Sequence, residues 1–376
     1  MSQQRATRIA VSSLFFLTGL CFLSWASRIP AIQEKLDLSE GGLGLVLLAL
    51  PIGSWISMPV AGFLVNRLGS RQVVLVAGLV YAMILPLLGV VTAAWQLVGV
   101  LVLFGFIGNV ANIAVNTQAV AVEVMYGRTI MASFHGLWST GGLTGSLIGM
   151  FMEGQHVEPY QHFLLITLMA AVIVAASTKY VAAHDVNKQE GKTKFTMPDR
   201  LLLILGVIAF CSMICEGAMF DWSGVYFKKV IHAPAIIIGA GSVAFMSTMA
   251  LFRFIADWLT IRYGTKRVLQ LSGAVTAVGL LIAVLLPYLP TAVLGFLMVG
   301  AGVSSVVPLV YSAAGKSDKL SPGAALATVS TIGYLGFLCG PPIIGLIAQV
   351  SSLSISFSVI AIMGACIAVM GSRAKV

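Results

Sequence analysis

The chain has 376 residues, of which 59% are hydrophobic and only 9% are charged. A water-soluble globular protein has about 45–50% apolar and about 25% charged residues, so this composition excludes a soluble domain and predicts a protein embedded in lipid. The net charge of +9 does not indicate nucleic-acid binding, because the basic residues lie in short segments between apolar stretches, where they set membrane topology.

The apolar stretches are each about 20 residues long, which is the length that a ~30 Å hydrocarbon core requires. Basic residues precede the first stretch as in a signal peptide, but its length and the many similar stretches that follow favour a retained first helix. We therefore predict an all-α membrane protein of twelve transmembrane helices. They are expected near residues 8–28, 42–64, 72–92, 96–122, 130–152, 162–183, 202–224, 236–258, 268–288, 291–313, 324–348 and 354–371.

The longest polar stretch divides these helices six and six. We predict an N-terminal six-helix bundle over 1–183, a cytoplasmic linker over 184–200 and a C-terminal six-helix bundle over 201–376. With the N-terminus inside, 17 of the 22 Lys and Arg residues fall in inside segments, four fall outside, and one lies within a span. This bias predicts that both termini are cytoplasmic.

The two halves repeat at an offset of 195 residues. GFLVNRLGSR (62–71) matches DWLTIRYGTK (257–266), and the same offset pairs glycines along the two halves, as in Gly141 with Gly336. Two related six-helix halves are typical of secondary transporters, in which a central polar site lies between the halves. The repeat therefore predicts transport by alternating access between two pseudo-symmetric bundles.

Other functional classes lack their motifs in this sequence. It contains no phosphate-binding loop, nucleophile elbow or H-E-x-x-H pattern, so an ATP-driven pump is disfavoured and an intramembrane enzyme or sensor stays a distant alternative. The five cysteines lie inside apolar stretches without partners in zinc-site spacing, so we expect free thiols and neither a metal nor a cofactor.

The segment 62–71 resembles the G-x-L-x-D-x-x-G-x-R loop motif of the major facilitator superfamily, with Asn66 where that family usually has Asp. SWASRIPAI (24–32), FHGLWSTGGLTG (134–145), EGAMFDW (216–222) and GYLGFLCGPPIIG (333–345) are similar to a bacterial branch of permeases related to fucose-permease-like sugar transporters. The resemblance implies the major facilitator fold, the bacterial inner membrane and a small polar solute that is sugar-like, a polyol or a cyclitol. We expect a monomer, and efflux of amphiphilic or cationic drugs is the alternative within transport.

Three asparagines form a stripe on the fourth predicted helix. Asn109, Asn112 and Asn116 lie three and four residues apart and share one face. Their amides can donate and accept several hydrogen bonds, which suits a hydroxylated ligand, although amides also join helices to one another. The repeat offset maps this face onto Ser304 and Tyr311 in the second half.

Aromatic side chains and a histidine complete the predicted substrate site. Trp25 on the first helix could stack on a sugar ring or a cation. His135 and Trp138 lie one turn apart on the fifth helix, where packing is the competing interpretation for a lone histidine. Tyr334 on the eleventh helix is a further candidate, one turn after the repeat partner of His135.

Glu216 lies near the centre of the seventh helix and is the best candidate to couple transport to protons. Lipid opposes its charge, so it could take up and release a proton as the site opens to each side. A structural acid held by a hydroxyl group of the first or the eleventh helix is the alternative. His135 is the other candidate proton carrier, because an imidazole titrates near neutral pH.

Charged residues near the helix ends predict two gates. On the outer side, Arg28 could pair with Asp221, or its charge could simply reach the interface. On the inner side, we expect a salt bridge between Arg253 and Asp257, which lie one turn apart. At the end of the fourth helix, we expect Glu123 to form a structural salt bridge of the same kind with the nearby basic residues Arg67, Arg71 and Arg128.

Overall fold

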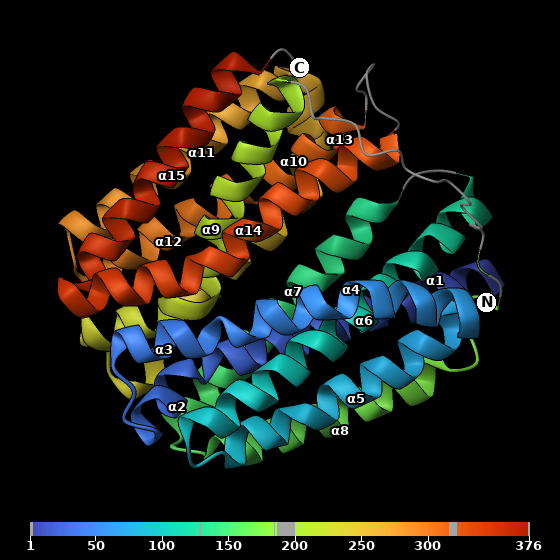
Figure 1. Cartoon of the computed structure of the whole chain (residues 1–376), viewed down its shortest axis with the longest axis horizontal. Helices are drawn as coiled ribbons and strands as arrows, with labels where there is room; N and C mark the ends of the chain where they lie inside the picture. The colour runs from blue at the N-terminus through green and yellow to red at the C-terminus, as the bar shows by residue number, and fades with distance from the viewer. Residues whose placement is uncertain (1–2, 128–129, 184, 186–199, 316–321, 375–376) are drawn as a thin grey trace. The chain divides into compact units, whose positions relative to one another are not determined.

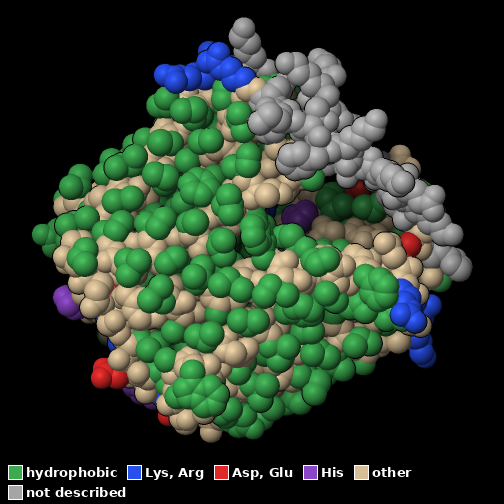
Figure 2. Space-filling model, in the orientation of Figure 1, with side chains coloured by type: hydrophobic (Ala, Val, Ile, Leu, Met, Phe, Trp, Pro, Cys, Tyr) green, Lys and Arg blue, Asp and Glu red, His purple; other side chains and the backbone are tan. Residues whose placement is uncertain are grey.

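The computed structural model describes residues 3–127, 130–183, 185, 200–315 and 322–374. Within these ranges every regular element is a helix, and no strand is present. This confirms the predicted all-α class. Hydrophobic side chains cover most of the face shown in Figure 2, as expected of a surface that contacts lipid.

The helices form two compact units, which are coloured blue to green and yellow-green to red in Figure 1. Unit 1 contains α1 (Gln3–Ser27), α2 (Ile29–Lys35), α4 (Ala49–Leu68), α5 (Ser70–Val90), α6 (Ala94–Tyr126), α7 (Met131–Gly154), α8 (Pro159–Ser177) and the short 3-10 helix η1 (Ala235–Ile237). Unit 2 contains α9 (Arg200–Lys229), α10 (Ala240–Tyr263), α11 (Thr265–Leu285), α12 (Leu289–Val303), α13 (Val306–Ala314), α14 (Pro322–Val350) and α15 (Leu353–Arg373). The helix α3 (Glu40–Leu47) begins in unit 2 and ends in unit 1. All but two residues of the predicted linker, 184–200, lie outside the described ranges.

Eleven helical spans within the described residues are long and apolar enough to cross a membrane. The remaining predicted span, near 130–152, corresponds to α7, which is 24 residues long and therefore of sufficient length. Its glycines, hydroxyl residues and His135 make it less apolar than the others. A helix of this composition gains little from contact with lipid, and it packs closely on α1.

Close helix contacts explain the glycine stripes in both units. A Cβ atom on Gly141 would lie 2.0 Å from the carbonyl oxygen of Phe16, where α7 crosses α1. A Cβ atom on Gly336 would lie 2.4 Å from the carbonyl oxygen of Phe210, where α14 crosses α9. These repeat-related glycines therefore let the helix backbones approach each other, which is the packing role expected of small residues in membranes.

A break divides the tenth span into α12 and α13. Pro308 has no N–H group, so it cannot donate the helical hydrogen bond to the carbonyl of Ser304. Ser304 and Ser305 accordingly lie between the two helices. Buried residues of α13, such as Val310, lie in the core cluster of unit 2, and the partly buried Tyr311 packs against it.

Each unit contains a short segment from the opposite half of the sequence. Residues Ser39–Gly44 precede α4 in the chain but belong to unit 2, and Pro234–Gly239 precede α10 but belong to unit 1. In unit 1, η1 packs against α7, and a Cβ atom on Gly239 would lie 2.8 Å from the Cβ atom of Met150. We call these the exchanged segments.

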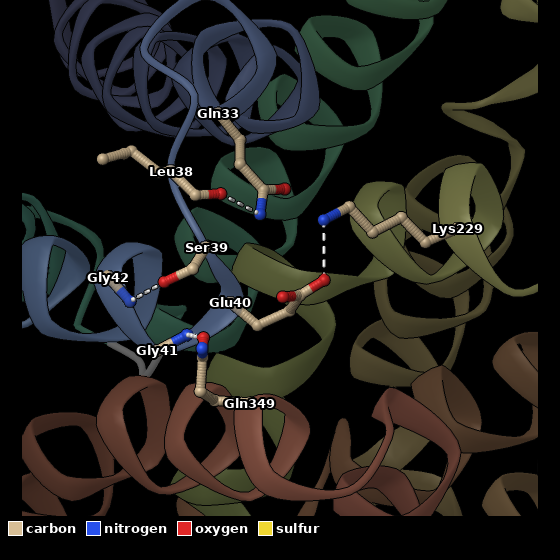
Figure 3. A network of polar contacts seen from close by, with 8 residues as sticks. All are labelled: Gln33, Leu38, Ser39, Glu40, Gly41, Gly42, Lys229 and Gln349. Carbon is tan, nitrogen blue, oxygen red and sulfur yellow. Dashed lines mark hydrogen bonds and ion pairs between the residues drawn. The ribbon is translucent and has the colours of Figure 1, made fainter.

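Polar contacts hold the exchanged segment Ser39–Gly44 within unit 2 (Figure 3). The Nζ atom of Lys229 lies 2.7 Å from Oε1 of Glu40. The backbone N–H of Gly41 donates to Oε1 of Gln349 at 3.1 Å. The segment is therefore attached both to the end of α9 and to the end of α14.

Candidate functional site

In unit 1, Asn109 joins two helices. Its Nδ2 atom donates to the carbonyl oxygen of Ser54 at 3.1 Å and to Oγ of Ser57 at 2.8 Å, both on α4. The side chain is buried within these contacts. In this conformation Asn109 therefore plays the interhelical role that the sequence left open as an alternative.

The other two amides of the stripe are more accessible. Asn116 donates through Nδ2 to the carbonyl oxygen of Asn112 at 2.8 Å and to its Oδ1 atom at 3.1 Å. Asn112 is exposed and Asn116 is half-buried. An amide that faced lipid within a membrane span would be costly, so these two side chains indicate a face of α6 that water or a polar solute can reach.

The aromatic candidates of unit 1 differ in accessibility. His135 is exposed on α7, with its ring edge-on to Phe15 of α1 at a centroid distance of 5.5 Å. Trp138 is half-buried, and its ring lies 6.2 Å from that of Phe22. Trp25 is only 1% exposed. His135 and Trp138 are therefore at least partly accessible, whereas Trp25 is enclosed.

In unit 2, Glu216 and Arg253 form an ion pair within the spans. Oε2 of Glu216 on α9 lies 3.8 Å from Nη2 of Arg253 on α10. Oγ of Ser212 lies 3.5 Å from Oε1 of Glu216, at the limit of a hydrogen bond. The side chain of Asp257 lies outside what the structure describes, so the Arg253–Asp257 pair stays a prediction. The Glu216–Arg253 pair was not predicted, because the two residues are far apart in the sequence.

The tyrosine and serine candidates of unit 2 differ in their surroundings. Tyr311 of α13 is half-buried, shares a hydrogen bond with Ser330 of α14, and interacts electrostatically with Glu216. Tyr334 is half-buried, with its ring 6.0 Å from that of Phe337. Ser304 is fully buried and donates to the carbonyl oxygen of Ala301 at 2.8 Å. Tyr311 is therefore the predicted residue that the structure brings close to Glu216.

Arg28 is held by residues of its own unit. Its Nη1 atom lies 2.6 Å from Oε2 of Glu153 at the end of α7, and its Nη2 atom donates to the carbonyl oxygen of Val157. Burial lowers the pKa of the Arg28 guanidinium, and the charges of Glu153 and Glu158 oppose that shift. Asp221, the expected partner of Arg28, is half-buried on α9. The sequence did not identify Glu153 as the partner of Arg28, and the Arg28–Asp221 gate stays a prediction.

Glu123 caps a helix. Its Oε1 atom accepts from the backbone N–H of Ile130 at 2.6 Å and of Met131 at 2.8 Å, at the start of α7. The sequence predicted that this carboxylate pairs with an arginine, and one of the candidates, Arg128, lies outside the described residues. A carboxylate at a helix N-terminus is also favoured by the helix dipole, so this role needs no ion pair.

The two arginines of the 62–71 motif have different surroundings. Nη2 of Arg71 donates to the carbonyl oxygen of Thr178 at 3.0 Å, which ties the start of α5 to the end of α8. The guanidinium of Arg67 lies over the ring of Phe63, 5.7 Å from its centroid. Their gating role stays a prediction.

Asp185 supplies an acid beside this motif. Its carboxylate accepts from the backbone N–H of Ser70 at 2.8 Å and from the Ser70 hydroxyl, which also accepts from Nε2 of Gln118 at 2.6 Å. Asn66 replaces the family's usual aspartate in the motif, and the carboxylate of Asp185 contacts Ser70 of the same motif. The position of Asp185 after α8 gave no signal that it would return to the start of α5.

These observations define a multi-pass membrane protein that moves small molecules: two repeated helical units, each with polar side chains accessible within its spans. The model of the Major Facilitator Superfamily matches residues 11–247 and 205–374. The chain belongs to this superfamily, and it is a transporter rather than an enzyme.

Known relatives and structures resemble the chain over most of its length. An uncharacterised transporter of this superfamily from Yersinia pestis is 33% identical, over 96% of this chain and 93% of the relative. The multidrug resistance protein MdtG of Yersinia enterocolitica is 25% identical, over 79% of this chain and 75% of the relative. A point mutant of the nucleoside transporter NupG, 14% identical, superposes over the whole of both chains with a TM-score of 0.79.

Proposed function

We propose that the protein is a proton-coupled secondary transporter of a small polar solute that is sugar-like, a polyol or a cyclitol. It works by alternating access, as a monomer, in the bacterial cytoplasmic membrane with both termini in the cytoplasm. The observation that carries the proposal is the accessible amide face of α6, since Asn112 is exposed within a membrane span. Amides at such a place suit a ligand that is rich in hydroxyl groups.

Glu216 supplies the coupling. Its carboxyl group is buried within α9, where lipid and packed side chains oppose its charge. A group of this kind binds a proton from one side of the membrane and releases it to the other as the site changes access. A pH difference of one unit supplies about 1.4 kcal/mol per proton, enough for roughly tenfold accumulation of the solute.

A thermal-shift screen of the purified protein tests the substrate class. The probes are sugars, polyols, amino-cyclitols, nucleosides and cationic drugs. A ligand at 100 times its Kd stabilises the folded state by about 2.7 kcal/mol, which is visible as a higher Tm. We expect stabilisation by hydroxylated probes, followed by uptake of the binding compound into proteoliposomes under a pH gradient.

The Glu216→Gln variant tests the coupling in the same proteoliposomes. We expect it to bind the ligand but to lose accumulation driven by the pH gradient. Accumulation at the wild-type level in this variant would remove Glu216 from the mechanism.

Efflux of amphiphilic or cationic drugs is the second candidate function. The similarity to the multidrug resistance protein MdtG favours it. The same thermal-shift screen separates the two, because stabilisation by cationic drugs alone would support efflux, with Glu216 as the partner of the cation.

A further inference from the structure

A polar pocket lies in unit 1 where the start of α1 meets the end of α6. Its volume is about 490 Å³, and sites for small molecules typically have ~300–1,000 Å³. Asn116 of the accessible amide face lies almost three turns of α6 away, about 15 Å along the helix, so the pocket is separate from the proposed substrate site. It is lined by Gln4, Arg5, Arg8, Ile9 and Ser12 of α1 and by Tyr126 of α6.

The pocket is built from two helices that hold each other in place. Nε2 of Gln4 donates to the carbonyl oxygen of Met125 at 3.1 Å, which ties α1 to α6. The guanidinium of Arg8 lies over the ring of Tyr126, 5.5 Å from its centroid. A contact of this kind uses the face of the guanidinium, so the N–H donors in its plane remain for an anion.

Two arginines give the pocket its charge. Arg5, Arg8 and Ser12 are spaced three and four residues apart, so they share one face of α1. None of the lining residues is acidic, and neither arginine forms an ion pair with another described residue. Glu123, one turn before Tyr126, accepts from backbone N–H groups at the start of α7. Two positive charges therefore lie together without a counter-ion in the described part of the chain.

The apolar wall of the pocket indicates a ligand that comes from the membrane. Basic residues before a first membrane helix also set topology, but a topological charge needs neither a pocket nor a fixed direction. Ile9 is 48% exposed and lies on a membrane-spanning helix, so this wall continues into the region of the acyl chains. Basic pockets between membrane helices on the cytoplasmic side bind anionic lipid head groups, and the orientation proposed above places the start of α1 on that side.

We propose that this pocket binds the phosphate group of an anionic phospholipid. Arg5 and Arg8 bind the phosphate oxygens through paired N–H donors. The hydroxyl groups of Ser12 and Tyr126 offer hydrogen bonds to the head group, and one acyl chain lies along Ile9. The lipid then joins α1 to α6 in addition to the hydrogen bond between these helices. The site is separate from the solute site, so its tests use no solute and do not depend on the proposed function.

Lipid titration followed by native mass spectrometry tests the proposal on the full-length protein in detergent. The probes are dioleoylphosphatidylglycerol and dioleoylphosphatidylcholine, which share their acyl chains and a phosphate group, although the choline cation neutralises the second lipid. One arginine near an anionic head group contributes about fivefold in affinity. We therefore expect phosphatidylglycerol to bind at least ~10-fold more tightly than phosphatidylcholine. Equal affinities for the two lipids would overturn the proposal.

Two double variants matched in charge locate the bound lipid. Arg5→Gln combined with Arg8→Gln is expected to weaken phosphatidylglycerol binding at least ~10-fold and to leave phosphatidylcholine binding unchanged. The control, Lys266→Gln combined with Arg267→Gln, removes the same charge from exposed positions at the start of α11, and it is expected to bind phosphatidylglycerol like the wild type. Equal losses in both double variants would show attraction by net charge alone and would refute a site in the pocket.

Two further measurements use the wild-type protein, so they decide the question even if the arginine double variant does not fold. Phosphatidylglycerol with a photoreactive acyl chain is expected to label α1 between Gln4 and Ser12 and α6 around Tyr126, as located by peptide mass spectrometry. Labelling confined to other helices would contradict the site. Inorganic phosphate at millimolar concentration is expected to leave phosphatidylglycerol bound. Its displacement would assign the pocket to a soluble phosphate compound and overturn the lipid proposal.

Discussion

Replacing Glu153 by glutamine should destabilise unit 1, because it leaves the buried Arg28 charge without its closest counter-ion. Removal of one partner of a buried ion pair costs about 3–5 kcal/mol. The Glu153 side chain is 17% exposed, and the charge of Glu158 also acts on Arg28. Both features reduce the loss, so we expect about 2–3 kcal/mol. In a chain of this size the Tm falls by about 2 °C for each kcal/mol of lost stability, so we expect the Tm to fall by about 4–6 °C.

Differential scanning fluorimetry of the detergent-purified protein measures this change. The matched control is the double variant Glu153→Gln with Arg28→Met, which removes the orphaned charge and keeps much of the side-chain volume. We expect the double variant to recover most of the lost Tm, because it no longer buries an unpaired charge. A single variant within about 1 °C of the wild type, or a double variant less stable than the single one, would refute this reasoning.

Three further tests of the helix contacts use the same Tm assay, two of them with a matched control substitution. Gly141→Ala should lower the free energy of unfolding by about 1–3 kcal/mol, because its Cβ atom would overlap a backbone carbonyl group. Its control, Gly99→Ala, should be neutral or stabilising, because no atom lies within 4 Å of the added Cβ. Equal effects of the two substitutions on Tm would contradict the close α1–α7 crossing. Asn109→Ala should lower the free energy of unfolding by about 1 kcal/mol through lost contacts to α4. Asn112→Ala should keep the wild-type Tm and lose ligand binding. If instead Asn112→Ala lowered the Tm and Asn109→Ala lost ligand binding, the ligand would bind at Asn109 and not at Asn112. Asp185→Ala should cost about 0.5–2 kcal/mol by uncapping α5, and an unchanged Tm would contradict that contact.

The architecture was predictable because its signals are local. Apolar length identifies each span, and the repeat of 62–71 at 257–266 divides the chain into related halves. The α7 helix shows the limit of this signal, since its glycines and polar residues lower its apolar character while close packing on α1 keeps it helical. The division of the tenth span into α12 and α13 depends on the missing N–H group of Pro308, and the pattern of apolar residues does not predict this break.

The partners of polar residues were harder to predict, because depth and helical face do not say which neighbouring helix lies opposite. Asn109 and Asn112 share a face in sequence, yet one bonds to α4 and the other is exposed. Arg28 has candidate acids at similar depth on several helices, and the sequence gave no reason to choose Glu153. Asp185 lies at the start of the polar stretch 184–200, where composition predicts only a loop.

The exchanged segments have a consequence for how the chain folds. Adding the repeat offset of 195 to the residue numbers 39 and 44 gives 234 and 239, so Ser39–Gly44 and Pro234–Gly239 are the same part of the repeat. Each half of the sequence therefore supplies the same repeat element to the unit formed mainly by the other half. The N-terminal unit would then complete its packing only after translation has passed α9, so the two halves would mature together.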